Sequence, residues 1–341
     1  MTFLPGVELA ATFYQQAVRP LLEGWGHAAA FLGSGSDVLG YDTPRSTDHG
    51  WGPRLQVFVD PGEVVAARAA VDAGLPEEFA GWPVRFGWDD VPVSHHVAVT
   101  DLESWVVGQL GIDPRAGLAA KDWLGLPQQL LLEVTAGAVF ADPAGELARI
   151  RQAVAWYPDQ VWQWLLACQW RRLAQEEPFV GRTAEVGDEL GSRVLAARQV
   201  REVMRLCLLL ERRYAPYAKW LGSAFAQLDA AREVGPPLAR AFTAVTFPQR
   251  QAGLCEAYEA VARRHNSLGI TEPVEATVRP FYTRPFHVLD AGRFCQASLS
   301  TVTDPWLRSL PLTGAIDQAV DSTDVLSNAR VSKRLAAFWA Q

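Results

Sequence analysis

Lysine is scarce in this 341-residue chain, which has only three, Lys121, Lys219 and Lys333, among its 31 basic residues. Acidic residues number 38, so the formal net charge is −7. An acidic chain lacks the positive field that general nucleic-acid binding requires. We therefore expect no nucleic-acid partner. Because the chain has so few lysines, any lysine in a polar pocket would be a candidate site residue.

Cysteines and long apolar runs are also sparse. The four cysteines lie far apart, with no C-x-x-C pair, at Cys168, Cys207, Cys255 and Cys295. This spacing argues against a zinc site or a disulfide framework and favours buried free thiols. No stretch reaches the length of a membrane span, and the start, MTFLPGVELA, lacks the basic and apolar regions of a secretory signal. We expect a cytoplasmic protein with no membrane partner.

The first third of the chain has alternating strand and helix patterns. Short apolar runs predict strands, and Ala and Val at helical spacing predict helices. The strands are expected at Ala28–Leu32, Leu55–Val59 and Val93–Thr100, and the helices at Glu63–Ala73 and Leu102–Leu110.

After Asp142 the pattern becomes helical. Val161, Leu165 and Cys168 recur on one face of a tryptophan-rich segment. A second helix is expected around Val194–Leu208 and a third at Ala252–Ser267. The fold class is therefore α+β, with a mixed α/β domain over residues 1–140 and a helical domain over residues 141–341.

A glycine-serine turn follows the first predicted strand. Gly33-Ser34-Gly35-Ser36 would let the backbone approach a ligand, and its amides and hydroxyls suit phosphate oxygens. The same pattern also occurs as an ordinary strand-to-helix turn. Ser46-Thr47-Asp48 follows and is expected to enter the strand that leads through Arg54 to Val59.

A Gly-Ser turn followed by Asp-x-Asp on a strand is the signature of the nucleotidyltransferase superfamily. Several stretches resemble a bacterial family of predicted nucleotidyltransferases classed as a domain of unknown function: FLPGVELAATFY, LGSGSDVLGYDTPRSTDHGWGPRLQVF, LLEVTAGAVFAD, QWRRLAQEEPFVGRTAEVGDELGSR, LLERRYAPYAKWLG and AVDSTDVLS. The resemblance implies a small nucleotidyltransferase-like domain, a helical domain and a ligand cleft between them. In that superfamily the aspartates hold divalent metal against a nucleoside triphosphate.

The chain departs from this pattern at two positions. Gly50 stands where the resemblance implies a second aspartate, and Ala98 where it implies a glutamate on a neighbouring strand. A catalytic metal stabilises the transition state by several kcal/mol. Losing ~5 kcal/mol would slow a reaction by ~10³- to 10⁴-fold. We therefore predict a divergent member that lacks two of three metal-binding carboxylates, and we assign no metal ligands.

The candidate site residues each have a structural alternative. Catalytic candidates are acid–base groups: Asp48, His49, His96, Glu176 and Glu177. His95 and His96 lie on opposite strand faces, so at most one faces a pocket. Helix capping, core packing or a solvated helix end before Pro178 would equally explain these side chains.

Ligand or phosphate binding is expected of Gly33, Ser34, Ser36, Arg45, Tyr214 and Lys219. The resemblance suggests Lys219 as the lysine that reaches the triphosphate. Arg45 and Arg54 would meet phosphates or pair with Asp42 or Glu63.

Three functions follow from these residues. The preferred one is a nucleotidyltransferase-fold enzyme acting on a small molecule by metal-free acid–base chemistry, such as isomerisation, cyclisation or elimination. The second is transfer of a nucleotidyl group from a nucleoside triphosphate to a small-molecule acceptor, with Mg²⁺ and the triphosphate required. The third is a non-catalytic nucleotide or metabolite binder.

Overall fold

The computed structural model describes residues 3–337 of the chain. Its fold class is α+β, as predicted. The chain forms two compact units, each assembled from separate stretches. Of the described residues, the first unit comprises 3–118, 129–155 and 327–333, and the second comprises 119–128, 156–326 and 334–337. The sequence had predicted a boundary at residue 140.

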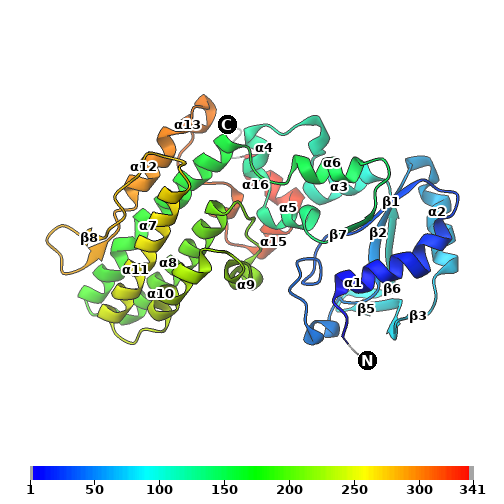
Figure 1. Ribbon diagram of the computed structural model, residues 1–341, viewed down its shortest axis with the longest axis horizontal. Coiled ribbons are helices and arrows are strands. Elements are labelled where there is room, and N and C mark those ends of the chain that lie inside the picture. Colours follow the sequence, from blue (N-terminus) through cyan, green and yellow to red (C-terminus); the bar gives the residue numbers. More distant parts are fainter. Residues whose placement is uncertain (1–2, 338–341) are drawn as a thin grey trace. The chain divides into compact units, whose positions relative to one another are not determined.

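The first unit is built on a five-stranded mixed sheet with the order β5-β6-β2-β1-β7 (Figure 1). β2 and β6 are parallel, whereas the other neighbours are antiparallel. The strands are β1 (His27–Phe31), β2 (Arg54–Val59), β5 (Arg85–Trp88), β6 (Val91–Thr100) and β7 (Ala138–Ala141).

One face of this sheet is covered by helices over its central strands. Leu55, Val57 and Val59 alternate along β2 with residues of the opposite face and pack with side chains of two helices. Those helices are α1 (Gly6–Phe13), continued by a π-helical turn at Tyr14–Val18, and α2 (Val64–Gly74). Apolar burial on this face provides the core of the unit.

The opposite face is covered at one end only. There Phe58, Ala30 and Leu32 pack with Trp105 of α3 (Leu102–Leu110) and Leu147 of α6 (Glu146–Ala153). Further along the same face, Ala98 on β6 is exposed and Gln56 on β2 is half-buried. This open end of the sheet borders the Gly33–Ser36 turn, since Gln56 bonds to Leu32.

The second unit is helical, with long helices side by side in Figure 1. These are α7 (Asp159–Glu185), α8 (Glu189–Leu210), α10 (Ala231–Thr243), α11 (Phe247–Ser267) and α12 (Gly292–Ser300). Trp164 and Trp170 of α7 are fully buried. The tryptophans of this helix therefore serve the core, as their helical spacing indicated.

Short elements complete the structure. The helices are α4 (Ala120–Gly125), α5 (Gln128–Thr135), α9 (Leu221–Ala226), α13 (Pro305–Ser309), α14 (Ile316–Ala319), α15 (Thr323–Leu326) and α16 (Ala329–Ala336). The strands are β3 (Glu78–Phe79), β4 (Trp82–Pro83), β8 (Arg279–Pro280) and β9 (His287–Val288).

The strands and helices that the sequence predicted are found to within a few residues, whereas α1, β5 and β7 were not predicted. All three strands and both helices expected in the first third are present, and α3 matches its predicted range. The second predicted helix is longer than expected and runs from Glu189 to Leu210. All four cysteines are free, and Cys168, Cys207 and Cys295 are buried, as expected.

Candidate functional site

The turn after β1 presents free backbone amides. Ser34 and Gly35 are exposed, and Ser36 is half-buried. Within residues 3–337, the amides of Ser34, Gly35 and Ser36 make no hydrogen bond, whereas the Gly33 amide donates to the Glu133 carbonyl at 2.8 Å. Adjacent unpaired N–H groups in a turn create a partial positive charge that attracts anions. The turn is therefore suited to a phosphate group.

An ion pair holds this turn in place. Nη2 of Arg54 donates to Oδ1 of Asp37 at 2.7 Å and to the Ser34 carbonyl at 2.9 Å. Asp37 is only 2% exposed, so the pair is largely desolvated. The expected pairing of Arg54 with Asp42 or Glu63 is thus wrong, because its partner is Asp37. Its contact with phosphates stays a prediction. Sequence analysis had assigned Asp37 no role, because its partner lies 17 residues further along the chain.

Gly35 is required by this arrangement. Its φ is +134°, a conformation that L side chains rarely adopt. A Cβ at this position would collide with the Asp37 carboxylate and lie 2.5 Å from Nη2 of Arg54. A larger residue would displace the ion pair, the turn or both.

A glutamine fixes the chain where it enters the turn. The Gln56 side chain accepts from the Leu32 amide at 2.8 Å and donates to the Leu32 carbonyl at 3.1 Å. Gln56 is the register partner of Ala98 in the parallel β2–β6 pair, so both side chains lie on the same sheet face. Ala98 therefore faces the open end of the sheet, but its side chain has no atom that could coordinate a metal ion.

Asp48 does not enter a strand, which corrects the prediction. It ends a 3₁₀ helix, Pro44–Asp48, and β2 begins only at Arg54. The helix forms because Pro44 fixes the backbone at its start and the Thr43 side chain accepts from the Arg45 amide at 3.2 Å. Asp48 is exposed and lies 3.4 Å from the guanidinium of Arg45, which is also exposed.

The residues that follow Asp48 pack against an aromatic cluster on β5. His49 is exposed, with Nε2 3.6 Å from Oδ2 of Asp89. Gly50 has a φ of +62°, and a Cβ there would lie 3.3 Å from the Trp88 ring. At the position of the implied second aspartate, the backbone of Gly50 therefore packs against the indole ring of Trp88.

These positions do not fit the metal site that the superfamily resemblance implies. Gly50 and Ala98 offer no side-chain donor, and Asp48 is on an exposed 3₁₀ helix. Across the described part of the chain, no group of three or more His, Cys, Asp or Glu side chains is arranged to hold a metal ion. Mg²⁺ sites usually combine carboxylates with substrate phosphates.

The two histidines of β6 point to opposite faces, as expected. His95 turns toward α2, with Nε2 2.6 Å from Oδ1 of Asp72. The His96 ring lies 4.3 Å from the Phe86 ring and 4.9 Å from the Trp88 ring, between centroids. Burial lowers the pKa of His96, and a hydrogen bond to the Phe86 carbonyl opposes this effect.

That hydrogen bond defines the tautomer of His96. Nε2 lies 2.8 Å from the Phe86 carbonyl oxygen, which can only accept. The hydrogen of the neutral ring is therefore on Nε2, and Nδ1 is left able to accept a proton. Of the predicted acid–base residues in this unit, His96 is the one on the same sheet face as Gln56 and Ala98.

Glu176 and Glu177 do not end their helix, which is a second correction. α7 continues through Pro178 to Glu185. Glu176 forms a bidentate ion pair with Arg198 at 2.7 and 3.0 Å. Glu177 is buried, and its carboxylate accepts from the amides of Leu289 and Ala291, both at 2.8 Å. Burial raises its pKa to about 7.

Tyr214 and Lys219 occupy different environments in the helical unit. Tyr214 is buried, with its ring 4.8 Å from the Trp156 ring and 5.3 Å from the Tyr157 ring. Burial raises the pKa of its hydroxyl. Lys219 is exposed, with Nζ 5.0 Å from the Trp220 ring centroid. The binding roles of both residues stay predictions.

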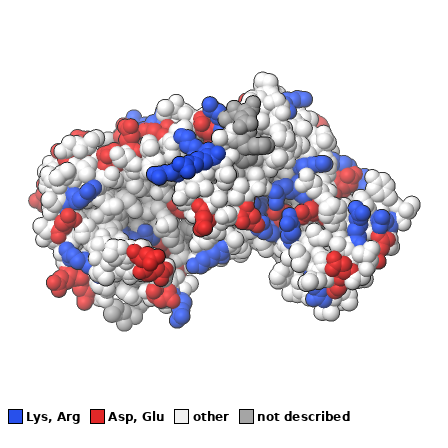
Figure 2. Space-filling view, turned by 180° about the vertical axis from the view of Figure 1, so that it is seen from behind, with Lys and Arg blue, Asp and Glu red and all other residues white. Residues whose placement is uncertain are grey.

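Two further features concern the surface charge and the hydropathy of the helices. Basic and acidic side chains are interspersed on the face shown in Figure 2. Among the described residues, no helix is long and apolar enough to span a bilayer.

Comparison with known proteins gives two matches. A protein-family model described as a domain of unknown function (DUF4037) matches residues 123–221, less than half of the chain. Among solved structures, the crystal structure of a nucleotidyltransferase-like protein from Exiguobacterium sibiricum is similar, with 12% identity and a TM-score of 0.32. The match covers 89% of this chain and 91% of that one. A TM-score this low does not establish a shared fold. No curated protein matches the chain.

Proposed function

We propose that this protein binds the phosphate groups of a small molecule, with a nucleoside triphosphate as the first ligand to test, at the Gly33–Ser36 turn. Binding uses backbone amides and does not require divalent metal. Metal-dependent nucleotidyl transfer is, in this proposal, weakened or replaced.

One observation carries the proposal. Three consecutive amides, at residues 34–36, lack hydrogen-bond partners within residues 3–337 and lie in an exposed turn. The Arg54–Asp37 pair and the Gln56 clamp hold that turn on both sides. A prearranged set of donors binds an anion without a further ordering cost, which favours affinity.

The donor set supports metal independence. Asp48 is the one carboxylate present at the three expected positions, and the exposed Arg45 beside it offsets its charge. A single exposed carboxylate contributes little to a site for a hydrated divalent ion. The phosphate charge would be balanced by the amide dipoles of residues 34–36.

His96 favours a catalytic version of the same proposal. Its Nδ1 is an acceptor in a half-buried ring on the face that carries Gln56 and Ala98. A neutral imidazole at pH 7 is a suitable general base. The second candidate function is therefore metal-free proton transfer on the bound small molecule, with His96 as the base.

Two glycine variants in one loop test the binding site. Gly35→Ala places a Cβ against Asp37 and Arg54, whereas Gly40→Ala has a φ of +73° and no atom within 4 Å of the new Cβ. Both variants therefore carry backbone strain, but only the first disturbs the turn. Calorimetric titration with ATP, GTP, CTP, UTP and tripolyphosphate should show at least tenfold weaker binding for Gly35→Ala, and wild-type affinity for Gly40→Ala.

Two results would contradict the site assignment. One is equal affinity of Gly35→Ala and the wild type, with both proteins folded by circular dichroism. The other is the absence of binding by every probe to the wild-type protein. An equal loss of affinity in both glycine variants would show that strain in the loop, and not the amides of the turn, causes the weaker binding.

A further inference from the structure

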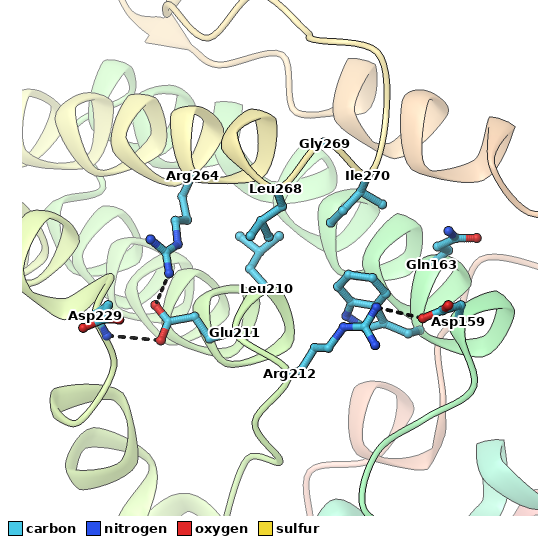
Figure 3. Close-up of a pocket in the computed structure, with 11 residues that line it drawn as sticks. Asp159, Gln163, Leu210, Glu211, Arg212, Asp229, Arg264, Leu268, Gly269 and Ile270 are labelled. Carbon is cyan, nitrogen blue, oxygen red and sulfur yellow. Dashed lines mark hydrogen bonds and ion pairs between the residues drawn. The ribbon is translucent and has the colours of Figure 1, made fainter.

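A pocket of about 630 Å³ lies within the helical unit and is lined by none of the candidate site residues chosen from the sequence (Figure 3). It is formed where α7 begins and where α8 and α11 end, together with the segment 268–270. Its volume lies within the range of about 300–1,000 Å³ that is typical of small-molecule sites.

The middle of the pocket is apolar. Leu210 and Leu268 lie side by side between two groups of charged residues in Figure 3. Ile270 extends this apolar surface toward Gln163. Such a surface accommodates a short hydrocarbon chain and excludes water from it.

One end of the pocket offers hydrogen-bond donors. The Arg212 guanidinium lies 4.0 Å above the Trp162 ring, and its Nη2 donates to Asp159 at 2.7 Å. Trp162 is itself fixed by a 2.7 Å bond from its Nε1 to the Leu209 carbonyl. Arg212 remains 47% exposed, so the rest of its fork is accessible.

A glutamine adds to this donor end. Gln163 accepts from Gln160 through its amide oxygen at 3.0 Å, which leaves its amide nitrogen to donate.

Arg212 also has a φ of +52°, a costly conformation for a non-glycine residue. Its side chain is held at the pocket by the stacking and ion pair described above.

The other end of the pocket offers an acceptor. Glu211 is fully engaged by the amides of Asp229 and Ala230 and by the Arg264 guanidinium. The Asp229 carboxylate makes no hydrogen bond or ion pair with the described part of the chain. Because Glu211 and Arg264 offset each other, this end carries a net negative charge from Asp229. The C-terminal end of α8 adds partial negative charge.

We propose that this pocket binds a linear zwitterion of the amino-acid class, in which an apolar chain separates the two charges. The carboxylate would accept from Arg212 and Gln163, the chain would lie on Leu210 and Leu268, and the ammonium would donate to Asp229. The proposal concerns only the helical unit and does not depend on phosphate binding at the turn.

A length series tests this assignment. Calorimetric titration of the full chain with ω-amino acids, from 3-aminopropanoate to 8-aminooctanoate, should show saturable binding with an optimum at one chain length. Hexanoate and hexylamine, which each carry one of the two charges, should bind at least tenfold more weakly than the best zwitterion.

Variants locate the binding within the pocket. Asp229→Asn and Gln163→Ala should each weaken the best zwitterion several-fold, whereas Arg213→Gln, on the exposed residue next to Arg212, should have no effect. Gln163 lies on a helix surface, so its variant keeps the test valid should Asp229→Asn destabilise the fold. Binding of hexylamine or hexanoate that is as tight as that of the best zwitterion would overturn the proposal. The absence of binding by every probe at ~10 mM, which corresponds to a binding free energy of about −3 kcal/mol, would also overturn it.

Discussion

Glu177 shows how a single side chain makes the stability of the helical unit depend on pH. Its pKa in the folded protein is raised to about 7 from an ordinary value of 4.5, because the carboxyl group is buried. The folded state therefore holds a proton that the unfolded state releases between these values. Its contribution to stability is complete below pH 4.5 and is lost as the pH rises through 7.

We predict that Glu177→Gln reduces the pH dependence of stability. The shift corresponds to about 3 kcal/mol between the two limits. The wild type should thus lose stability from pH 5 to pH 8, and the variant should lose less. Glutamine retains one acceptor for the amides of Leu289 and Ala291, so a cost of about 1–3 kcal/mol is expected below pH 5.

Urea denaturation from pH 5 to 8 measures this difference. Glu176→Gln is the matched control, since Glu176 is next to Glu177 on α7 but its carboxylate pairs with Arg198 of α8. If the free energy of unfolding of Glu177→Gln falls with pH as steeply as that of the wild type, Glu177 is not the group that holds a proton in the folded state.

At the scale of elements, the Gly33–Ser36 turn depends on the buried pair between Arg54 and Asp37. Removing one partner of such a pair leaves an uncompensated charge and typically costs about 3–5 kcal/mol. We predict that Arg54→Leu and Asp37→Leu each destabilise the protein strongly, whereas the double variant costs much less than the sum. A double-mutant cycle by urea denaturation gives the coupling. Strictly additive effects would show that the pair does not hold the turn.

Local patterns predicted the elements but not their contacts. The strands flanking the turn were identified because apolar runs and glycine are local signals. The 3₁₀ helix that ends at Asp48 was missed, although Thr43 and Pro44 are a recognisable start signal. Its placement on the exposed surface depends on contacts such as those of Gly50 with Trp88.

The course of α7 through Pro178 could not be read locally either. A proline normally interrupts a helix, because it lacks an N–H and clashes with the preceding turn. Here Glu177 binds the amides of residues 289 and 291, and Gly181 packs closely against the Phe286 ring. These contacts join residues more than 100 positions apart. The pocket residues Arg212 and Asp229 were missed for the same reason.

At the scale of the whole molecule, the chain returns to its first unit near the C-terminus. Residues 327–333 belong to that unit, and Nζ of Lys333 donates to the Gly111 carbonyl at 3.1 Å, where α3 ends. We predict that a chain ending at Leu326 shows several-fold faster amide exchange at the end of α3, measured by hydrogen–deuterium exchange. The centre of α8 is the internal control. Unchanged exchange in α3 would show that this segment does not stabilise the unit.

Phosphate binding without divalent metal is the property on which the proposed function of this protein rests. The most direct measurement is a thermal-shift titration with ATP, GTP, CTP, UTP and tripolyphosphate, each in Mg²⁺ and in EDTA. Saturation at ~100 Kd stabilises the folded state by ~2.7 kcal/mol, which moves the midpoint by a few degrees. We predict a shift for at least one of these probes that is as large in EDTA as in Mg²⁺. A shift seen only with Mg²⁺, or no shift with any probe, would contradict the account.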